Sequence, residues 1–218
     1  MDWTRQIDGY CERTDFSLWS EPVNAVTNAA FLIAALVMWR RTGGVTGARV
    51  LCVILFVIGI GSTLFHTFAT AWAAMADNLP ILSYILVYVF LIHRDVLGLE
   101  AVWAGTVTAG FIPYAALVVW VLQPVPFFGI SSFYWTVPIL LVVYGWALRG
   151  RMPGLARGFW TGAAILAASI TFRSLDESLC ARLPVGTHFM WHVLNAVMLG
   201  YMIEVYARHV LAGRGAER

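Results

Sequence analysis

The stretch Val50-Leu-Cys-Val-Ile-Leu-Phe-Val-Ile-Gly-Ile-Gly-Ser-Thr-Leu-Phe65 is apolar at nearly every position and is followed directly by His66. This composition predicts a membrane-spanning helix, because in lipid each backbone N–H and C=O group must find its partner within the segment. Comparable apolar runs recur from Pro22 to the end of the chain, between short polar or Gly/Pro breaks. We therefore expect an all-α integral membrane protein, a seven-transmembrane helix bundle with spans at residues 22–38, 50–65, 78–92, 101–122, 133–148, 159–172 and 188–206.

The composition of the whole chain agrees with this fold class. Of its 218 residues, 60% are hydrophobic and 12% are charged, whereas an ordinary soluble domain carries about 25% charged residues. All basic residues are arginine, and a chain without lysine cannot form the Schiff base of a retinal pigment. The net charge of +2 is spread over separate loops and predicts no nucleic-acid partner. We expect a single domain over residues 1–218, with an N-terminal segment (1–21) before the helix bundle (22–211), and we predict no protein partner.

The arginines divide unevenly between the two sides of the predicted bundle. The polar first twenty residues predict no cleavable signal peptide, so insertion begins with the first span. By the positive-inside rule the arginine-rich side faces the cytoplasm, which places the N-terminus outside and the C-terminus in the cytoplasm. The arginine-rich side holds Arg40, Arg41, Arg49, Arg94, Arg149, Arg151, Arg157, Arg208, Arg214 and Arg218, and the outer side holds Arg5, Arg13, Arg173 and Arg182.

This topology gathers polar residues from distant parts of the chain on the outer, extracytoplasmic side. His66 ends the second span and Asp77 begins the third. Arg173 and Asp176 follow the sixth span, and His188 opens the seventh. The acidic N-terminal segment lies on the same side, so five pieces of chain converge on one face of the membrane.

Three histidines in this group have the spacing of a metal site. His188 and His192 are four residues apart, which puts both imidazoles on one helical face, roughly 6 Å apart along the axis. His66 lies at a matching depth and supplies a third nitrogen. Three neutral histidines with an open fourth position are typical of a catalytic zinc. Ser62 faces the same way as His66, and Asp77 enters from the same side, so both are expected to reach a bound water or substrate.

A simpler interpretation of these histidines stays open. Histidines near a membrane interface often only hydrogen-bond a backbone carbonyl. The third histidine and the acidic residue at the same depth favour the metal site, because an ionisable residue within a span is costly and is by default functional. For His93 and His209, at the opposite ends of spans three and seven, we expect the simpler role.

Taken together, these residues resemble the alkaline ceramidases and their bacterial relatives, within the superfamily that includes the adiponectin-receptor-like proteins. The resemblance covers essentially the whole chain. It rests on Cys11-Glu12, Glu21-Pro-Val-Asn-Ala-Val-Thr-Asn28, Ser62-x3-His66, Asp77, Asp176-x3-Cys180 and His188-x3-His192.

The resemblance implies an enzyme and a role for each residue of the site. It implies His66, His188 and His192 as zinc ligands, Asp77 as the general base, and Ser62 as a donor that stabilises the oxyanion. The implied reaction is hydrolysis of a lipid amide, ceramide or a related N-acyl lipid, to a fatty acid and a free amine or sphingoid base. The lipid bilayer would deliver the substrate, and the apolar bundle would hold its acyl chain.

The resemblance also implies a calcium site before the first span. Its oxygen ligands would be the side chains of Asp8, Glu12, Thr14 and Glu21 and the carbonyl of Tyr10, since calcium prefers hard oxygen ligands. Asp15 is an alternative to Asp8. The other interpretation that stays open is a solvated acidic stretch, balanced by Arg5 and Arg13.

The chain has three cysteines. Cys52 lies in an apolar run and is expected to pack in the core. Cys11 and Cys180 both fall on the outer, oxidising side, so we predict that they form a disulfide, a pairing that the resemblance supports.

Two other functions stay open. One is a seven-helix receptor or binding protein whose zinc is structural. The other is a haem-binding electron-transfer bundle, which also uses histidines on different helices but explains neither Asp77 nor a third histidine. Asp77 separates the first alternative from an enzyme, because a structural metal has no need of an acid beside an open position.

Overall fold

The structure is a computed structural model and describes residues 2–216. Within this range the regular elements are helices, and an isolated β-bridge joins Gln6 to Thr70. The all-helical fold class is therefore confirmed. The elements are α1 (Pro22–Thr27), α2 (Ala29–Arg41), α3 (Thr46–Phe68), α4 (Ala71–Leu91), the π-helical turn η1 (Ile92–Val96), α5 (Ala101–Leu122), α6 (Pro126–Gly129), α7 (Ser132–Leu148), α8 (Pro153–Leu179) and α9 (His188–Ala216).

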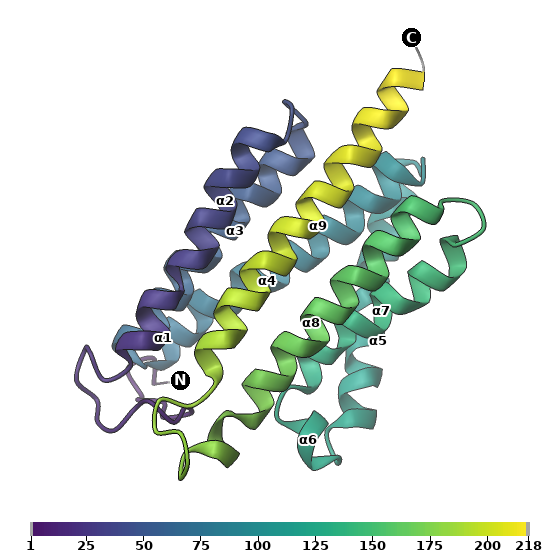
Figure 1. Cartoon of the computed structure of the whole chain (residues 1–218). Coiled ribbons are helices and arrows are strands. Elements are labelled where there is room, and N and C mark those ends of the chain that lie inside the picture. The colour runs from purple at the N-terminus through teal and green to yellow at the C-terminus, as the bar shows by residue number, and fades with distance from the viewer. Residues whose placement is uncertain (1, 217–218) are drawn as a thin grey trace.

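The long helices form a closed ring (Figure 1). Each packs against the next in chain order, from α2 through α3, α4, α5, α7 and α8 to α9, and α9 returns to contact α2. Helix α9 also contacts α3, so these two helices meet inside the ring. The N-terminal segment, α6 and the connection between α8 and α9 lie at one end of the bundle (Figure 1). We call this the histidine end, because it holds His66, His188 and His192.

Within the described residues, five helical segments are long and apolar enough to cross a membrane. They are Pro22–Arg41, Thr46–Phe68, Ala71–Val96, Ala101–Leu122 and Pro153–Leu179, and Ser132–Leu148 is a shorter apolar helix. The predicted span at 101–122 has the observed bounds, whereas most of the others are longer than predicted, because their polar first and last turns continue the helical hydrogen bonding. The predicted span at 22–38 is divided at Asn28 into α1 and α2. Residue 1, Arg218 and the side chain of Arg214 lie outside the described part.

The N-terminal segment closes the histidine end of the ring. Its backbone pairs with the turn between α3 and α4, through hydrogen bonds from Ile7 N–H to the Ala69 carbonyl and from Ala71 N–H to the Arg5 carbonyl. A disulfide between Cys11 and Cys180 ties it to the end of α8, with Cα atoms 5.2 Å apart. The predicted disulfide is thus present.

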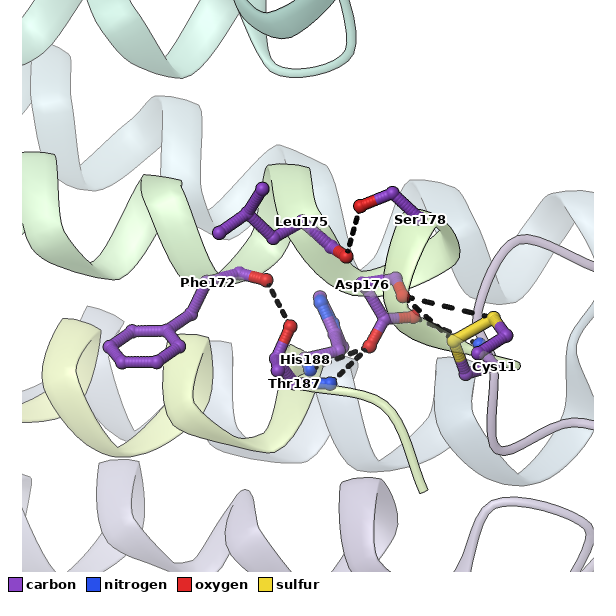
Figure 2. Close-up of a disulfide and its surroundings, with 8 residues drawn as sticks. Cys11, Phe172, Leu175, Asp176, Ser178, Thr187 and His188 are labelled. Atoms are coloured by element: carbon purple, nitrogen blue, oxygen red, sulfur yellow. Dashed lines mark hydrogen bonds between the residues drawn. A yellow bond between two sulfur atoms is a disulfide. The ribbon is translucent and has the colours of Figure 1, made fainter. Parts of the chain in front are cut away.

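Asp176 organises the same corner from the last turns of α8. Figure 2 shows its carboxylate accepting hydrogen bonds from the backbone N–H groups of Cys11, Thr187 and His188. Two of these donors belong to the start of α9, so Asp176 caps that helix and compensates its positive end. Gly186 has a φ of +69°, and a Cβ at this position would collide with the Asp176 carboxylate. Glycine is therefore required where the chain turns into α9.

Candidate metal centre

The three histidines of the predicted site converge at the histidine end of the bundle. His66 lies in the last turn of α3, His188 is the first residue of α9, and His192 follows one helical turn later. All three side chains are buried. One nitrogen from each ring lies within 4.8 Å of the others. Among residues 2–216, no other group of three or more histidine, cysteine or acidic side chains has the geometry to hold a metal ion.

Hydrogen bonds at the outer edge of two rings determine which nitrogens face inward. His66 Nδ1 lies 2.6 Å from a carboxylate oxygen of Glu21, which can only accept, so Nδ1 of a neutral His66 carries the proton. His192 Nδ1 lies 2.9 Å from the Thr27 hydroxyl. That hydroxyl is also within hydrogen-bonding distance of the carbonyls of Val23 and Asn24. When it donates its single proton to one of them, His192 Nδ1 is the donor, and both Nε2 atoms are left with lone pairs.

These two lone pairs point at each other. The Nε2 atoms of His66 and His192 are 3.1 Å apart, with both ring protons already placed on the Nδ1 atoms. Two ligands of a tetrahedral zinc with Zn–N bonds of about 2.05 Å lie about 3.3 Å apart. A bound cation would therefore relieve the repulsion between the two nitrogens at very nearly the existing separation. The donor set fits a metal ion of zinc type.

His188 completes the cluster with less support from hydrogen bonds. Its Nδ1 is buried and has no hydrogen-bond partner in the described structure. The ring of Tyr10 stacks on it, with ring centroids 3.6 Å apart. The aromatic contact fixes the plane of the imidazole, and the orphaned nitrogen is a further sign of a site built for a ligand.

Ser62 and Asp77 meet beside the histidines because α3 and α4 pack unusually closely. Gly61 provides this contact, since a Cβ at this position would collide with the Ala76 carbonyl oxygen. The Asp77 carboxylate lies within side-chain hydrogen-bonding reach of Ser62 and interacts electrostatically with His66 and Arg173. The structure thus brings together the serine, the acid and the histidines that the sequence placed on one side.

Two residues behind His66 have roles that the sequence analysis missed. Glu21 was expected to bind calcium, but its carboxylate contacts the His66 ring and accepts a hydrogen bond from Arg13 Nε at 2.6 Å. Burial alone would raise the pKa of Glu21, yet the hydrogen bond to His66 and the charge of Arg13 lower it below its usual value. Glu21 is therefore ionised and fixes the ring of His66. In the sequence, the position of Glu21 directly before the first predicted span was the signal that could have indicated this contact with His66.

The other expected calcium ligands are exposed or bonded to other groups of the protein. Asp8 and Thr14 are exposed. Both carboxylate oxygens of Glu12 accept backbone N–H groups at the start of α1, from Val23 and Asn24. The Tyr10 carbonyl accepts a hydrogen bond from the Arg13 backbone. The arrangement does not fit a calcium ion, because these oxygens already have partners and Arg13 places a positive charge against Glu21.

An apolar cavity lies inside the ring. Side chains of α3, α4, α7, α8 and α9 line it. Trp191 of α9, the neighbour of His192, is part of the wall, and Tyr84, Tyr134, Leu166 and Met198 continue it away from the histidine end. The cavity has a volume of about 60 Å³, well below the roughly 300–1,000 Å³ of typical ligand pockets, so a long hydrocarbon chain would enter only if the surrounding side chains moved apart.

Arg173 adds a positive charge at the rim. Its guanidinium lies over the ring of Tyr134, 5.0 Å from the centroid, and donates hydrogen bonds to Ser131 and the Ile130 carbonyl. Its charge also acts on Asp77. The rings around Arg173 are Tyr134 of α7, Trp191 of α9 and Tyr10 of the N-terminal segment. The sequence analysis did not predict this contact, because the three residues are far apart in the chain.

Comparison with models of protein families identifies relatives of the chain. A family model described as Ceramidase matches residues 5–217, which is nearly the whole chain. A search among curated proteins finds no match.

Proposed function

The chain belongs to the ceramidase family, and from this premise we propose that it is a zinc-dependent hydrolase that cleaves the amide bond of ceramide or a related N-acyl lipid. The observation that carries the proposal is the pair of Nε2 lone pairs of His66 and His192, which face each other 3.1 Å apart in a buried site. His188 would be the third ligand. A site of three neutral histidines leaves one coordination position for water or substrate.

The metal would contribute what the side chains cannot. A zinc ion held by these histidines supplies a Lewis acid and lowers the pKa of a water molecule to about 7. Glu21 and Thr27 keep the protons of His66 and His192 on Nδ1, so the Nε2 atoms stay available as ligands.

Asp77 and Ser62 would handle the proton and the developing charge. Asp77 accepts the proton of the attacking water and returns it to the nitrogen of the leaving amine as the C–N bond breaks. The Ser62 hydroxyl donates a hydrogen bond to the carbonyl oxygen, where negative charge develops. The products are a fatty acid and a free amine. The Ser62 hydroxyl, which interacts with the Asp77 carboxylate, would turn its proton to the substrate oxygen when the lipid binds.

The apolar cavity would mark where the acyl chain of the substrate enters the bundle. At about 60 Å³ it would have to widen to take the chain, and its lining of aliphatic and aromatic side chains, Trp191 among them, suits a hydrocarbon. A lipid whose amide group reaches the metal would thus bury its chain along α4, α7 and α9. This arrangement supports an N-acyl lipid over a water-soluble amide.

We propose further that the whole chain is one domain and that all seven ring helices cross the bilayer, α7 and α9 included. They lie alongside the five segments that meet the criteria of length and hydropathy (Figure 1). Eight of the arginines whose side chains are described fall on the end opposite the histidines, namely Arg40, Arg41, Arg49, Arg94, Arg149, Arg151, Arg157 and Arg208, which supports an outer, extracytoplasmic active site. Labelling of cysteines introduced at Ser17 and Gly150 with a membrane-impermeant maleimide tests this orientation. In intact cells, label at position 150 but not at 17 would reverse it.

The experiment that tests the function combines elemental analysis with an activity panel. Purified protein is expected to contain one zinc per chain and to release fatty acid from ceramide or another N-acyl lipid in mixed micelles. A protein that binds zinc but hydrolyses no member of the panel would instead be a receptor or binding protein with a structural metal. A protein without zinc or another transition metal would refute the proposal.

A further inference from the structure

Arg13 is a buried positive charge that the reaction does not use. Only 5% of the residue is exposed, although arginine is rarely buried unless it is paired. Its guanidinium has three oxygen partners from three parts of the chain. They are the Glu21 carboxylate at 2.6 Å, the Asp15 carbonyl at 3.0 Å and the His66 carbonyl at 3.2 Å.

This set of partners is what a hard cation would also seek. One carboxylate and two backbone carbonyls surround the guanidinium, each bonded to a different nitrogen, and such oxygens are typical calcium ligands. Here the guanidinium takes all three. A divalent ion at the same place would face a buried positive charge and would find Glu21 already used by Arg13 and His66.

Arg13 is connected to His66 by two routes. One runs through Glu21, whose second carboxylate oxygen lies 2.6 Å from His66 Nδ1. The other is the direct hydrogen bond from Arg13 to the backbone carbonyl of His66. That carbonyl is in the last turn of α3, where no further helical turn supplies an N–H partner. The guanidinium thus holds both the backbone and, through Glu21, the ring of this histidine.

We propose that Arg13 takes the place of the calcium ion implied by the resemblance, and that through Glu21 it positions His66 so that the metal centre works without calcium. The inference rests on the proposed function in one respect, namely that His66 is a metal ligand. Arg13 is a positioning residue, since it lies behind the histidine and does not reach the reacting atoms.

The first test is the response of the wild-type protein to calcium. After removal of free divalent ions by gel filtration, millimolar CaCl2 is expected to leave the melting temperature in detergent, the zinc content and the rate of lipid hydrolysis unchanged. A clear rise in the melting temperature or in hydrolysis with calcium would overturn the proposal.

The second test removes the positive charge of Arg13. In Arg13→Ala, the three oxygens lose their positive partner, and calcium is expected to fill the gap. Without calcium the variant should melt well below the wild type. Saturating calcium should raise its melting temperature by roughly 5 °C, as expected for a ligand that binds the folded state, and should increase hydrolysis several-fold. Arg182→Ala is the matched control, because Arg182 is an exposed arginine at the same end of the bundle. An Arg13→Ala variant no more responsive to calcium than this control would refute the inference.

Arg13→Lys is a second variant, which tests the proposal even if Arg13→Ala does not fold. A lysine keeps the positive charge near Glu21 but loses the planar fork that reaches three oxygens. It is expected to be less stable than the wild type and to stay insensitive to calcium. A calcium response in Arg13→Lys would contradict the proposal. The melting temperature needs no substrate, so absence of hydrolysis in every protein would count against the proposed function and leave this inference to be decided by the melting data.

Discussion

The chain carries two groups of histidines near helix ends, and their surroundings differ sharply. At the histidine end, the Nε2 atoms of His66 and His192 face each other. At the opposite end, His93 Nδ1 bonds to the Val89 carbonyl of the preceding turn, and its Nε2 bonds to the Tyr144 hydroxyl. His209 Nδ1 likewise bonds to the Val205 carbonyl.

Burial does not explain this difference. His93 is buried, as are the histidines of the candidate centre. What differs is the partner of each histidine ring nitrogen. At the opposite end, the partners are a carbonyl of the same helix and a tyrosine hydroxyl, so no ligand is needed. At the histidine end, the Nε2 atoms of His66 and His192 lie 3.1 Å from each other, an arrangement that a shared cation would stabilise. Convergence, rather than burial or position near a helix end, marks the functional site.

Replacement of one converging histidine should have the largest effect. His192→Ala is expected to lower the zinc content to near zero and hydrolysis by at least about 10³-fold, because both the ion and its chemistry are lost. The comparison variant is His209→Ala, which should keep one zinc per chain and nearly normal hydrolysis. Elemental analysis and fatty-acid release measure both. Equal loss in the two variants would show that histidines at both ends matter only for stability.

The next test compares Asp77 at the histidine end with Asp95 at the opposite end of the bundle. Asp77→Asn should lower hydrolysis by about 10²–10⁴-fold, the usual contribution of a general acid–base group, and should leave the zinc content unchanged. Asp95 forms an ion pair with Arg94 at the opposite end, so Asp95→Asn should retain hydrolysis per folded protein. Zinc loss in Asp77→Asn would assign this acid to the metal instead of the proton transfer.

The sequence predicted the cluster of three histidines better than the residues that support it. The apolar runs located the helices, because membrane burial demands continuous apolar stretches. The spacing of His188 and His192 and the depth of His66 brought the ligands to one end, and the cysteines on one side predicted the disulfide that the structure contains. These features depend on local periodicity and on topology alone.

The surroundings of the ligands could not be predicted in the same way. The hydrogen bond between His192 and the Thr27 hydroxyl depends on how the short helix α1 packs against α9. The contact of Arg13 with Glu21 depends on the path of an irregular segment, for which no periodicity exists. A carboxylate near Pro22 resembled a calcium ligand in sequence, and only the fold shows that an arginine already neutralises it.

A smaller effect is expected at the partner of His192. Thr27→Val has nearly the same shape but removes the hydroxyl that accepts the Nδ1 proton. Loss of such a supporting hydrogen bond typically weakens metal affinity 10–100-fold. Competition with a chromophoric zinc chelator would measure this loss, and excess zinc should restore most of the hydrolysis. Thr106→Val, on the exposed face of α5, is the control. Unchanged affinity in Thr27→Val would mean that the α9 backbone alone fixes the ring of His192.

The smallest change in activity is expected from the equivalent substitution at the opposite end. Tyr144→Phe removes the hydroxyl that donates to His93 Nε2 and leaves this buried nitrogen without its partner. The cost should be about 1–3 kcal/mol of stability, which lowers the melting temperature by about 2–4 °C for each kcal/mol. Zinc affinity and hydrolysis per folded protein should stay within about twofold of the wild type. A loss of zinc affinity as large as that of Thr27→Val would mean that the two ends of the bundle are coupled, because a hydrogen bond to His93 can reach the metal ligands only through the packing of the helices between them.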